Sequence, residues 1–143
     1  PAAKGKKRLT VDIHCHIHTP IADEMVKDVF NLDVDPLFRF AGAKTREVNL
    51  KQAVTIKEKI TEIAPRLAEM DRMGIDMQAI SVAPPQYFYW TEPGLGRATT
   101  RVINDNIASV VAAHPDRFVG LGHLPMQHPQ FAIAEEHEIA LSA

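Results

Sequence analysis

The sequence is poor in the features that mark secreted, membrane-embedded and repetitive proteins. Its 143 residues include one cysteine, Cys15, so no disulfide can form within it, and we expect a reducing, cytoplasmic compartment. No apolar run approaches the roughly 18 residues of a membrane span. The basic start lacks the apolar stretch of a secretory signal, and no internal repeat or low-complexity tract is present. We therefore expect one globular domain that contacts no membrane.

The sequence also lacks a large excess of charge of either sign. Sixteen lysines and arginines stand against eighteen acidic residues, for a net charge of -2. Four of the basic residues, Lys4, Lys6, Lys7 and Arg8, lie in the first eight positions. The remaining sequence is acidic, which does not fit a nucleic-acid-binding surface. We interpret residues 1–8 as a solvated basic tail and expect no nucleic-acid partner.

Apolar periodicity predicts strands that alternate with helices. The expected strands are Leu9–Ile17, Asp76–Ala83 and Arg117–Leu124. The expected helices are about Leu50–Met73, as one helix or two broken near Pro65, then Ala98–Ala113 and Phe131–Leu141. Residues 20–49 contain Pro20, Pro36 and Gly42 and predict an irregular insertion with short helical pieces.

This alternation predicts an α/β fold with a parallel sheet and helical crossovers. Three strands make a small sheet, and the last helix leads to no fourth strand. A (β/α)8 barrel of the TIM type needs about 250 residues. We therefore interpret residues 1–143 as the N-terminal part of a single barrel domain, which supplies the first three β/α units.

The most informative stretch is Asp12-Ile13-His14-Cys15-His16-Ile17-His18. Successive side chains of a strand point to opposite faces, so Asp12, His14 and His16 should share one face. Two imidazoles spaced in this way can bind one metal ion, and a nearby carboxylate can orient them. The alternative is a solvated polar face on an edge strand. The position near the carboxyl end of the first strand favours the metal site, because sites form there in parallel α/β folds.

Three neighbouring signals are less specific. Cys15 should face away from the histidines and pack in the interior. His18 follows the expected strand end and is a weaker candidate ligand. His123 lies near the end of the third strand, where it either faces the mouth of a pocket or is packed and hydrogen-bonded.

Three stretches, taken in order, resemble a known family. They are VDIHCHIHTP, RLAEMDRMGIDMQAISVAPP and ASVVAAHPDRFVGLGHLPMQ, and YFYW follows the second of them. Together they resemble the amidohydrolase superfamily, its amidohydrolase-2 branch, and within that branch α-amino-β-carboxymuconate-ε-semialdehyde decarboxylase and its relatives. The resemblance covers nearly the whole sequence except residues 22–59.

The resemblance implies a divalent metal, usually zinc, held in part by the His-x-His pair, which corresponds to His14 and His16. The family's other ligands, a histidine from a middle strand and an aspartate from the last strand, have no counterpart here, and neither does its catalytic histidine. An arginine that contacts substrate in the decarboxylase has only a loose counterpart, Arg46.

For the complete protein, the resemblance implies a metal-dependent enzyme that acts on a small carboxylic acid. Its reaction is non-oxidative decarboxylation of a carboxylated unsaturated or aromatic acid, or metal-dependent hydrolysis. A homodimer is implied as well. The sequence by itself also allows an inactive fragment that serves as a binding or assembly module, because it supplies only two ligands and catalytic zinc sites usually need three.

Overall fold

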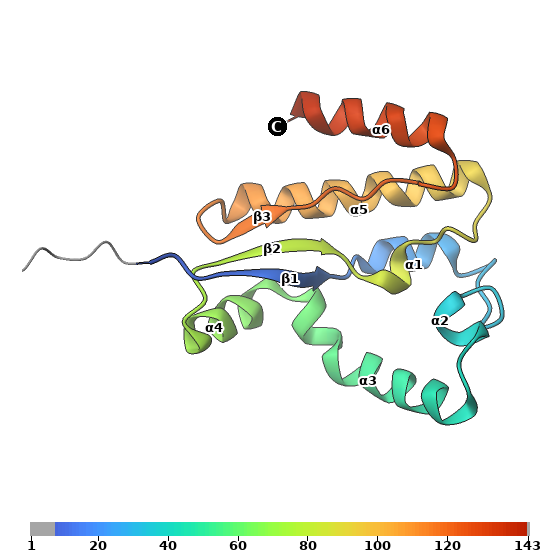
Figure 1. The fold of residues 1–143 in the computed structure, drawn as a ribbon, viewed down its shortest axis with the longest axis horizontal. Coiled ribbons are helices and arrows are strands. Elements are labelled where there is room, and N and C mark those ends of the chain that lie inside the picture. The colour runs from blue at the N-terminus through green and yellow to red at the C-terminus, as the bar shows by residue number, and fades with distance from the viewer. Residues whose placement is uncertain (1–7, 143) are drawn as a thin grey trace, which may run out of the picture.

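The computed structural model describes residues 8–142, without the side chains of residues 36, 37 and 137–142. The predicted alternation of strands and helices is present (Figure 1). In chain order the elements are β1 (Val11–Ile17), α1 (Pro20–Val26), α2 (Pro36–Arg39), α3 (Ala43–Thr61), α4 (Ile63–Met73), β2 (Met77–Val82), the 3-10 helix η1 (Pro84–Gln86), α5 (Pro93–Ala113), β3 (Phe118–Gly120) and α6 (Pro129–Ser142). No helix within the described residues is long and apolar enough to cross a membrane.

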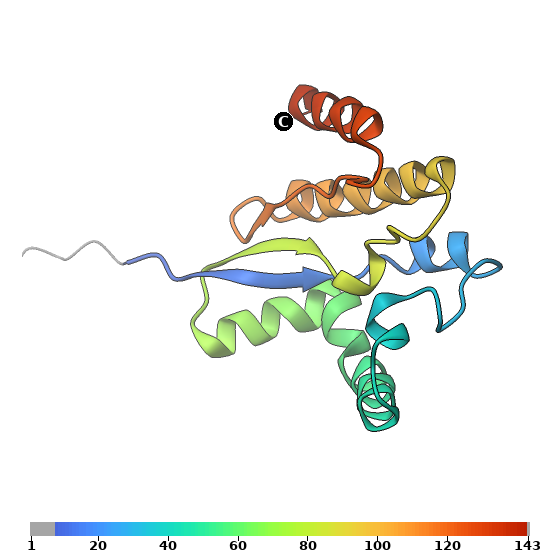
Figure 2. The same cartoon turned by 45° about the vertical axis from the view of Figure 1, so that its right-hand side comes forward.

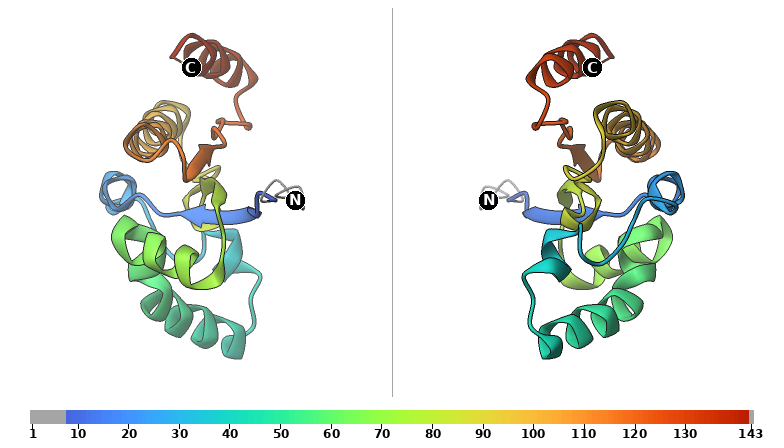
Figure 3. Two further views of the ribbon diagram at one scale, coloured as in Figure 1. Left: turned by 90° about the vertical axis from the view of Figure 1, so that its left-hand side faces the viewer. Right: turned by 90° about the vertical axis from the view of Figure 1, so that its right-hand side faces the viewer.

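The three strands form one parallel sheet in the order β1-β2-β3, as the sequence predicts. End-on views show α1, α4 and α5 gathered on one side of the strands, which leaves the other side of the sheet open (Figure 3). Such one-sided layering is that of the outer helices and the inner strands of a barrel wall. The fold class is thus an α/β arrangement of three barrel-type β/α units.

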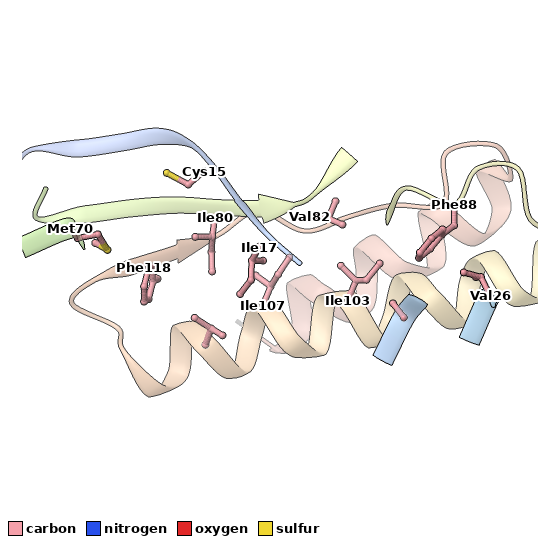
Figure 4. Packing of buried hydrophobic residues seen from close by; sticks show 12 residues of the cluster. Cys15, Ile17, Val26, Met70, Ile80, Val82, Phe88, Ile103, Ile107 and Phe118 are labelled. Atoms are coloured by element: carbon pink, nitrogen blue, oxygen red, sulfur yellow. The ribbon is translucent and has the colours of Figure 1, made fainter. Parts of the chain in front are cut away.

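The core lies between the sheet and these helices. Ile80 of β2, Phe118 of β3 and Ile103 of α5 are at most 1% exposed, and they pack together with Ile17 and Ile107 (Figure 4). The opposite face of the sheet carries exposed apolar side chains, with Ile13 78% and Val119 47% exposed. The core therefore lies on the helix-covered face, and the site discussed below lies on the open one.

A bulge interrupts β1. Asp12 pairs with Gln78, but Cys15 pairs with Ile80, so two residues of β1 lie opposite one residue of β2. An extra residue reverses the alternation of side chains on one side of it. Asp12 and Cys15 consequently share the helix-covered face, whereas a count of two residues per repeat places them on opposite faces.

The helical conformation is interrupted between α3 and α4 at Glu62, three residues before Pro65, near which the sequence predicts a break. Glu62 has an extended backbone (φ -100°, ψ 131°), and Pro65 is the third residue of α4. A proline in the first turn loses no helical hydrogen bond, whereas deeper in a helix its ring would clash with the preceding turn. The expected pair of helices is confirmed, with α3 beginning at Ala43 rather than near Leu50.

Other expected boundaries differ as well, and α6 begins at Pro129 rather than Phe131. The third strand pairs only over Phe118–Gly120 rather than Arg117–Leu124, because the backbone N–H of His123 donates to the Asn104 side chain instead of a strand. Helix α5 begins at Pro93 rather than Ala98, since the Glu92 carboxylate accepts from the backbone N–H of Gly94. Residues 20–49 contain α1, α2 and the start of α3; that they form an insertion stays a prediction. Residues 1–7 of the expected basic tail lie outside the described residues.

Gly120 is a site where any side chain should destabilise the fold. A Cβ atom there would lie 2.7 Å from Cγ2 of Ile107, so we expect Gly120→Ala to lower the free energy of unfolding by about 1–3 kcal/mol, measured by urea titration. Combining it with Ile107→Leu, which has no methyl group on Cβ, should recover part of that loss. Gly42→Ala is the control, because no atom lies within 4 Å of its added Cβ. An equal loss at both glycines would contradict this packing argument.

Candidate metal centre

The structure brings the two predicted ligands together. The rings of His14 and His16 lie 5.2 Å apart, centroid to centroid, with their planes at 88°. His14 is the middle residue of β1, and His16 is the last but one, toward its carboxyl end. His14 is exposed and His16 is half-buried. Two imidazoles at this separation can both direct a nitrogen at one ion, as the His-x-His spacing predicts.

The hydrogen bonds of His16 define which nitrogen is free. Its Nδ1 lies 3.1 Å from the carbonyl oxygen of Val82 and 3.1 Å from Oγ of Ser81. A carbonyl can only accept, so Nδ1 carries the proton in that bond. In the neutral ring Nε2 then keeps its lone pair, as in metal-binding histidines whose other nitrogen donates to the backbone. The β2 strand thus presets the tautomer that a metal needs.

Asp12 does not stand behind the two histidines, which corrects the sequence prediction. Its carboxylate accepts from the backbone N–H of His14 at 3.1 Å, and the bulge places it on the face of Cys15 and Gln78. Hydrogen bonds from the Cys15 side chain and the His14 backbone lower the pKa of Asp12. The carboxylate therefore supports the backbone of the metal motif rather than an imidazole.

Cys15 is a packing residue, as the sequence predicts. It is 6% exposed, and burial, followed by the hydrogen bond with Asp12, raises the pKa of its thiol to about 12. Its position on the helix-covered face, opposite the two histidines, makes this side chain part of the core rather than a candidate ligand.

Arg66 of α4 forms hydrogen bonds that fix the carboxyl end of β1. Its Nη2 donates to the backbone carbonyl of His16 at 2.6 Å, and its Nη1 donates to Oε1 of Gln78 at 3.1 Å. The side chain is 8% exposed, and burial lowers its pKa. A buried cation thus fixes the backbone of a candidate ligand from the helix-covered face. Sequence reasoning missed this role, because the contact joins residues 50 positions apart.

His18 belongs to a separate polar network. Its Nε2 lies 2.6 Å from Oδ2 of Asp23, and Gln86 donates to the other oxygen of that carboxylate at 2.9 Å. Gln86 also exchanges hydrogen bonds with the backbone of Thr19. The network joins the end of β1 to the start of α1, and it occupies His18 away from the pair.

Arg46 is occupied by the backbone. Its Nε donates to the carbonyl of Ala41 at 3.1 Å, and its Nη2 lies 3.5 Å from the carbonyl of Arg39. In this arrangement the guanidinium stabilises the connection between α2 and α3.

His123 is buried, which resolves the alternatives left open by the sequence in favour of packing. It is 5% exposed, and its ring stacks on Tyr87 at 5.5 Å and on Tyr89 at 5.6 Å. Burial lowers its pKa, and a backbone hydrogen bond with Tyr87 opposes this shift. The imidazole is therefore held neutral in the folded chain.

This burial predicts a pH-dependent stability. Below the ordinary pKa of 6.5, His123 is protonated in the unfolded chain but stays neutral in the folded chain until the pH reaches its lower folded-state pKa. The free energy of unfolding therefore falls as the pH drops from 7 toward that lower pKa. We expect His123→Gln to lessen this fall by up to about 1.4 kcal/mol per pH unit. Urea titrations of both chains between pH 7.5 and 5.5 measure the difference. Identical pH slopes would contradict a depressed pKa.

Among the side chains that the structure describes, no group of three or more His, Cys, Asp or Glu is arranged to hold a metal ion. A cavity of about 270 Å³ lies between α3, α4 and β2, lined by residues such as Glu58, Arg66 and Met70, and it includes neither candidate ligand. The described residues thus offer two candidate ligands, His14 and His16, whose role in metal binding stays a prediction.

Comparisons with known proteins give a family match and similar solved structures. A family model described as amidohydrolase (Amidohydro_2) matches residues 11–140. The 2-amino-3-carboxymuconate-6-semialdehyde decarboxylase of Dictyostelium discoideum is 40% identical over 70 residues, which are 49% of this chain and 20% of that relative. The chain therefore matches about a fifth of the relative's length.

Solved structures share the fold. The 5-carboxyvanillate decarboxylase of Sphingomonas paucimobilis superposes with a TM-score of 0.69 at 26% identity, covering 92% of this chain and 39% of that one. A dihydroxybenzoic acid decarboxylase of Polaromonas sp. JS666, solved with manganese and 2-nitroresorcinol, superposes with a TM-score of 0.64 at 23% identity, covering 91% and 34%. The latter likeness shows the fold alone.

Proposed function

Because this chain belongs to the amidohydrolase family, we propose that the complete protein is a metal-dependent carboxy-lyase acting on a carboxylated unsaturated or aromatic acid. The observation that carries the proposal is the His14–His16 pair, with rings 5.2 Å apart at the carboxyl end of β1. The Dictyostelium discoideum relative, which matches 49% of the chain, is a decarboxylase of such an acid. The Sphingomonas paucimobilis protein, whose structure superposes at 26% identity, is a decarboxylase of an aromatic acid.

The residues present fit a divalent metal as two of its ligands. His16 offers Nε2 because its Nδ1 is bonded to Val82, and His14 lies beside it. The resemblance favours zinc, while manganese is bound in the Polaromonas decarboxylase. When bound, a divalent cation would orient the acid's carboxylate and offset negative charge during the reaction. Around it, Arg66 and Ser81 fix the His16 backbone and ring.

The proposed reaction breaks one carbon–carbon bond. The carboxyl group leaves as CO2, and a proton replaces it at the same carbon, so no oxidant is needed. The open face of the sheet, which carries His14 and His16, is the side toward the centre of a barrel. The remaining ligands and the proton donor are expected from other strands, and the homodimer and the cytoplasmic location implied above stay predictions.

The complete protein tests the proposal. After chelation with EDTA it should release no CO2 from carboxylated acids such as 2-amino-3-carboxymuconate-6-semialdehyde, 5-carboxyvanillate or 2,6-dihydroxybenzoate. Zinc or manganese should restore CO2 release, detected by gas analysis. A metal-dependent hydrolase of ester or amide substrates, with none of the acids decarboxylated, would overturn the assignment in favour of hydrolysis.

Residues 1–143 alone should be catalytically silent, because the described part of the chain contains no three-ligand group and catalytic zinc usually has three protein ligands. We expect weak zinc binding, measured by native mass spectrometry, and no CO2 release. Adding the remaining strands and helices of the barrel, on the same chain or as a separate chain, should increase both zinc affinity and CO2 release. One tightly held zinc per chain together with turnover would show that a third ligand lies within this segment.

A further inference from the structure

The loop after η1 sends its aromatic side chains alternately to two sides. Phe88 has a positive φ of 48°, a left-handed conformation that is costly for a bulky residue. Its ring is 4% exposed and lies edge-on to Trp90, which in turn packs on Phe30. This turn buries Phe88, and it places the two neighbouring residues, Tyr87 and Tyr89, next to each other on another side of the loop.

Those flanking residues, Tyr87 and Tyr89, stack on each other. Their ring centroids are 5.4 Å apart and their planes differ by 19°, yet the two residues remain 38% and 40% exposed. The hydroxyl of Tyr89 donates to the carbonyl of Leu124 at 3.3 Å, and burial raises its pKa. The pair is therefore a partly exposed aromatic surface, in which a hydrogen bond holds the Tyr89 ring in place.

His123 supports this surface from beneath. It is nearly parallel to both tyrosine rings, at 18° and 22°. Asn104 fixes its backbone twice, by accepting from its N–H at 2.8 Å and donating to its carbonyl at 2.9 Å. Its buried Nε2 has no hydrogen-bond partner. The imidazole is thus held against the two tyrosine rings by the contacts from α5 and by the stack itself.

The stack and the histidine pair lie at the same edge of the sheet. The tyrosines follow β2, and His123 follows β3, while His14 and His16 lie toward the carboxyl end of β1 (Figure 1). The strand that precedes the tyrosines, β2, is the direct neighbour of β1, which carries the histidines. In the proposed arrangement the carboxylate of a planar acid lies toward the histidines and its ring toward the tyrosines.

We propose that Tyr87 and Tyr89 form a stacking platform that binds the planar ring or conjugated chain of the substrate beside the His14–His16 pair, with His123 as its positioning residue. This inference rests on the proposed function. It assigns the preference for an unsaturated over a saturated acid to the loop after β2. Aromatic rings gain most from other flat π-systems, because their faces and edges carry opposite partial charges.

Binding to the metal-loaded complete protein tests the platform. The probes are 2,6-dihydroxybenzoate, which is planar, and cyclohexanecarboxylate, which is not, both followed by titration calorimetry. In Tyr87→Leu and in Tyr89→Leu the dissociation constant for the planar acid should rise about tenfold. The constant for the saturated acid should stay within about twofold. Tyr87→Phe, which keeps the ring, should bind the planar acid like the original protein.

The outcomes separate the platform from the proposed function. Equal weakening of both acids, or no weakening of either, overturns the platform. If the original protein binds the planar acid in a ring-dependent manner but releases no CO2, the platform is supported and the decarboxylase assignment fails. If it binds metal and neither acid, both fail. Metal content measured beside each titration should stay unchanged in the tyrosine variants.

Discussion

His14→Ala and His16→Ala should each remove most of the metal from the complete protein and, with it, most CO2 release. Changes to residues that only contact a ligand already cost 10–100-fold in metal affinity or activity, so the loss of a ligand itself should cost at least about 100-fold. The expectation rests on the adjacent rings of the pair and on the free Nε2 of His16. Metal content after dialysis, measured by mass spectrometry, gives the result.

Two other histidines serve as matched controls for this experiment. His128 packs against Phe131, so His128→Ala should keep the metal. His18→Ala should keep it as well, because Nε2 of His18 is bonded to Asp23. Normal metal content in both His14 and His16 variants would refute the centre. Metal loss in His18→Ala alone would move the site to the start of α1.

The histidine motif shows how far sequence periodicity reaches. A period of two predicts correctly that His14 and His16 lie together and that Cys15 is buried. It places Asp12 wrongly, because the count assumes an uninterrupted ladder and the bulge between Asp12 and Cys15 adds one residue. A bulge is decided by pairing with β2, which lies more than sixty residues away in the sequence, so the local pattern carries no signal of it.

Helix α3 shows the complementary limit. Apolar residues at three- and four-residue steps predict a helix there, and the helix is present. No residue of α3 is buried, and Val54 is 79% exposed. Figures 1 and 2 show most of this helix lying apart from the strands. Periodicity thus predicts the helix, whereas what covers its apolar side depends on tertiary packing.

The tyrosine platform could have been suspected from the sequence in part. Four aromatic residues in a row after a strand, YFYW, are an unusual density of rings. Phe88 is buried and Trp90 is partly buried, whereas the two tyrosines are exposed. This division depends on the left-handed backbone of Phe88, a conformation that a bulky residue disfavours. Contacts with the surrounding residues hold a bulky residue in that conformation. The local sequence therefore does not predict the conformation, and only the three-dimensional structure reveals it.

Arg66→Met should produce the largest loss of stability among the changes considered. The variant keeps much of the apolar stem and removes the guanidinium, which leaves the His16 carbonyl and the Gln78 amide oxygen without their donor. Hydrogen bonds from charged groups contribute about 1.5–3 kcal/mol each, and an unsatisfied buried acceptor costs about 1–3 kcal/mol. We expect the free energy of unfolding to fall by about 3 kcal/mol, measured by urea titration.

The control for this change lies six residues further along α4. Arg72 pairs with Glu69 at 2.6 Å on the surface, where its side chain is 69% exposed, and such pairs contribute little because water and salt screen them. Arg72→Met should therefore leave stability nearly unchanged. Arg66→Lys should fall between the two, since an ammonium group lacks the planar fork that reaches both acceptors.

Arg66 should also affect metal affinity, because its Nη2 donates to the backbone carbonyl of His16, a candidate ligand. In the complete protein, Arg66→Met should weaken metal affinity by about 10-fold, as expected for a residue that orients a ligand without binding the ion. Competition with a chelator measures that affinity under conditions where the variant stays folded. A folded variant with unchanged metal affinity would limit Arg66 to a purely structural role and show that the backbone of β1 holds His16 in place without it.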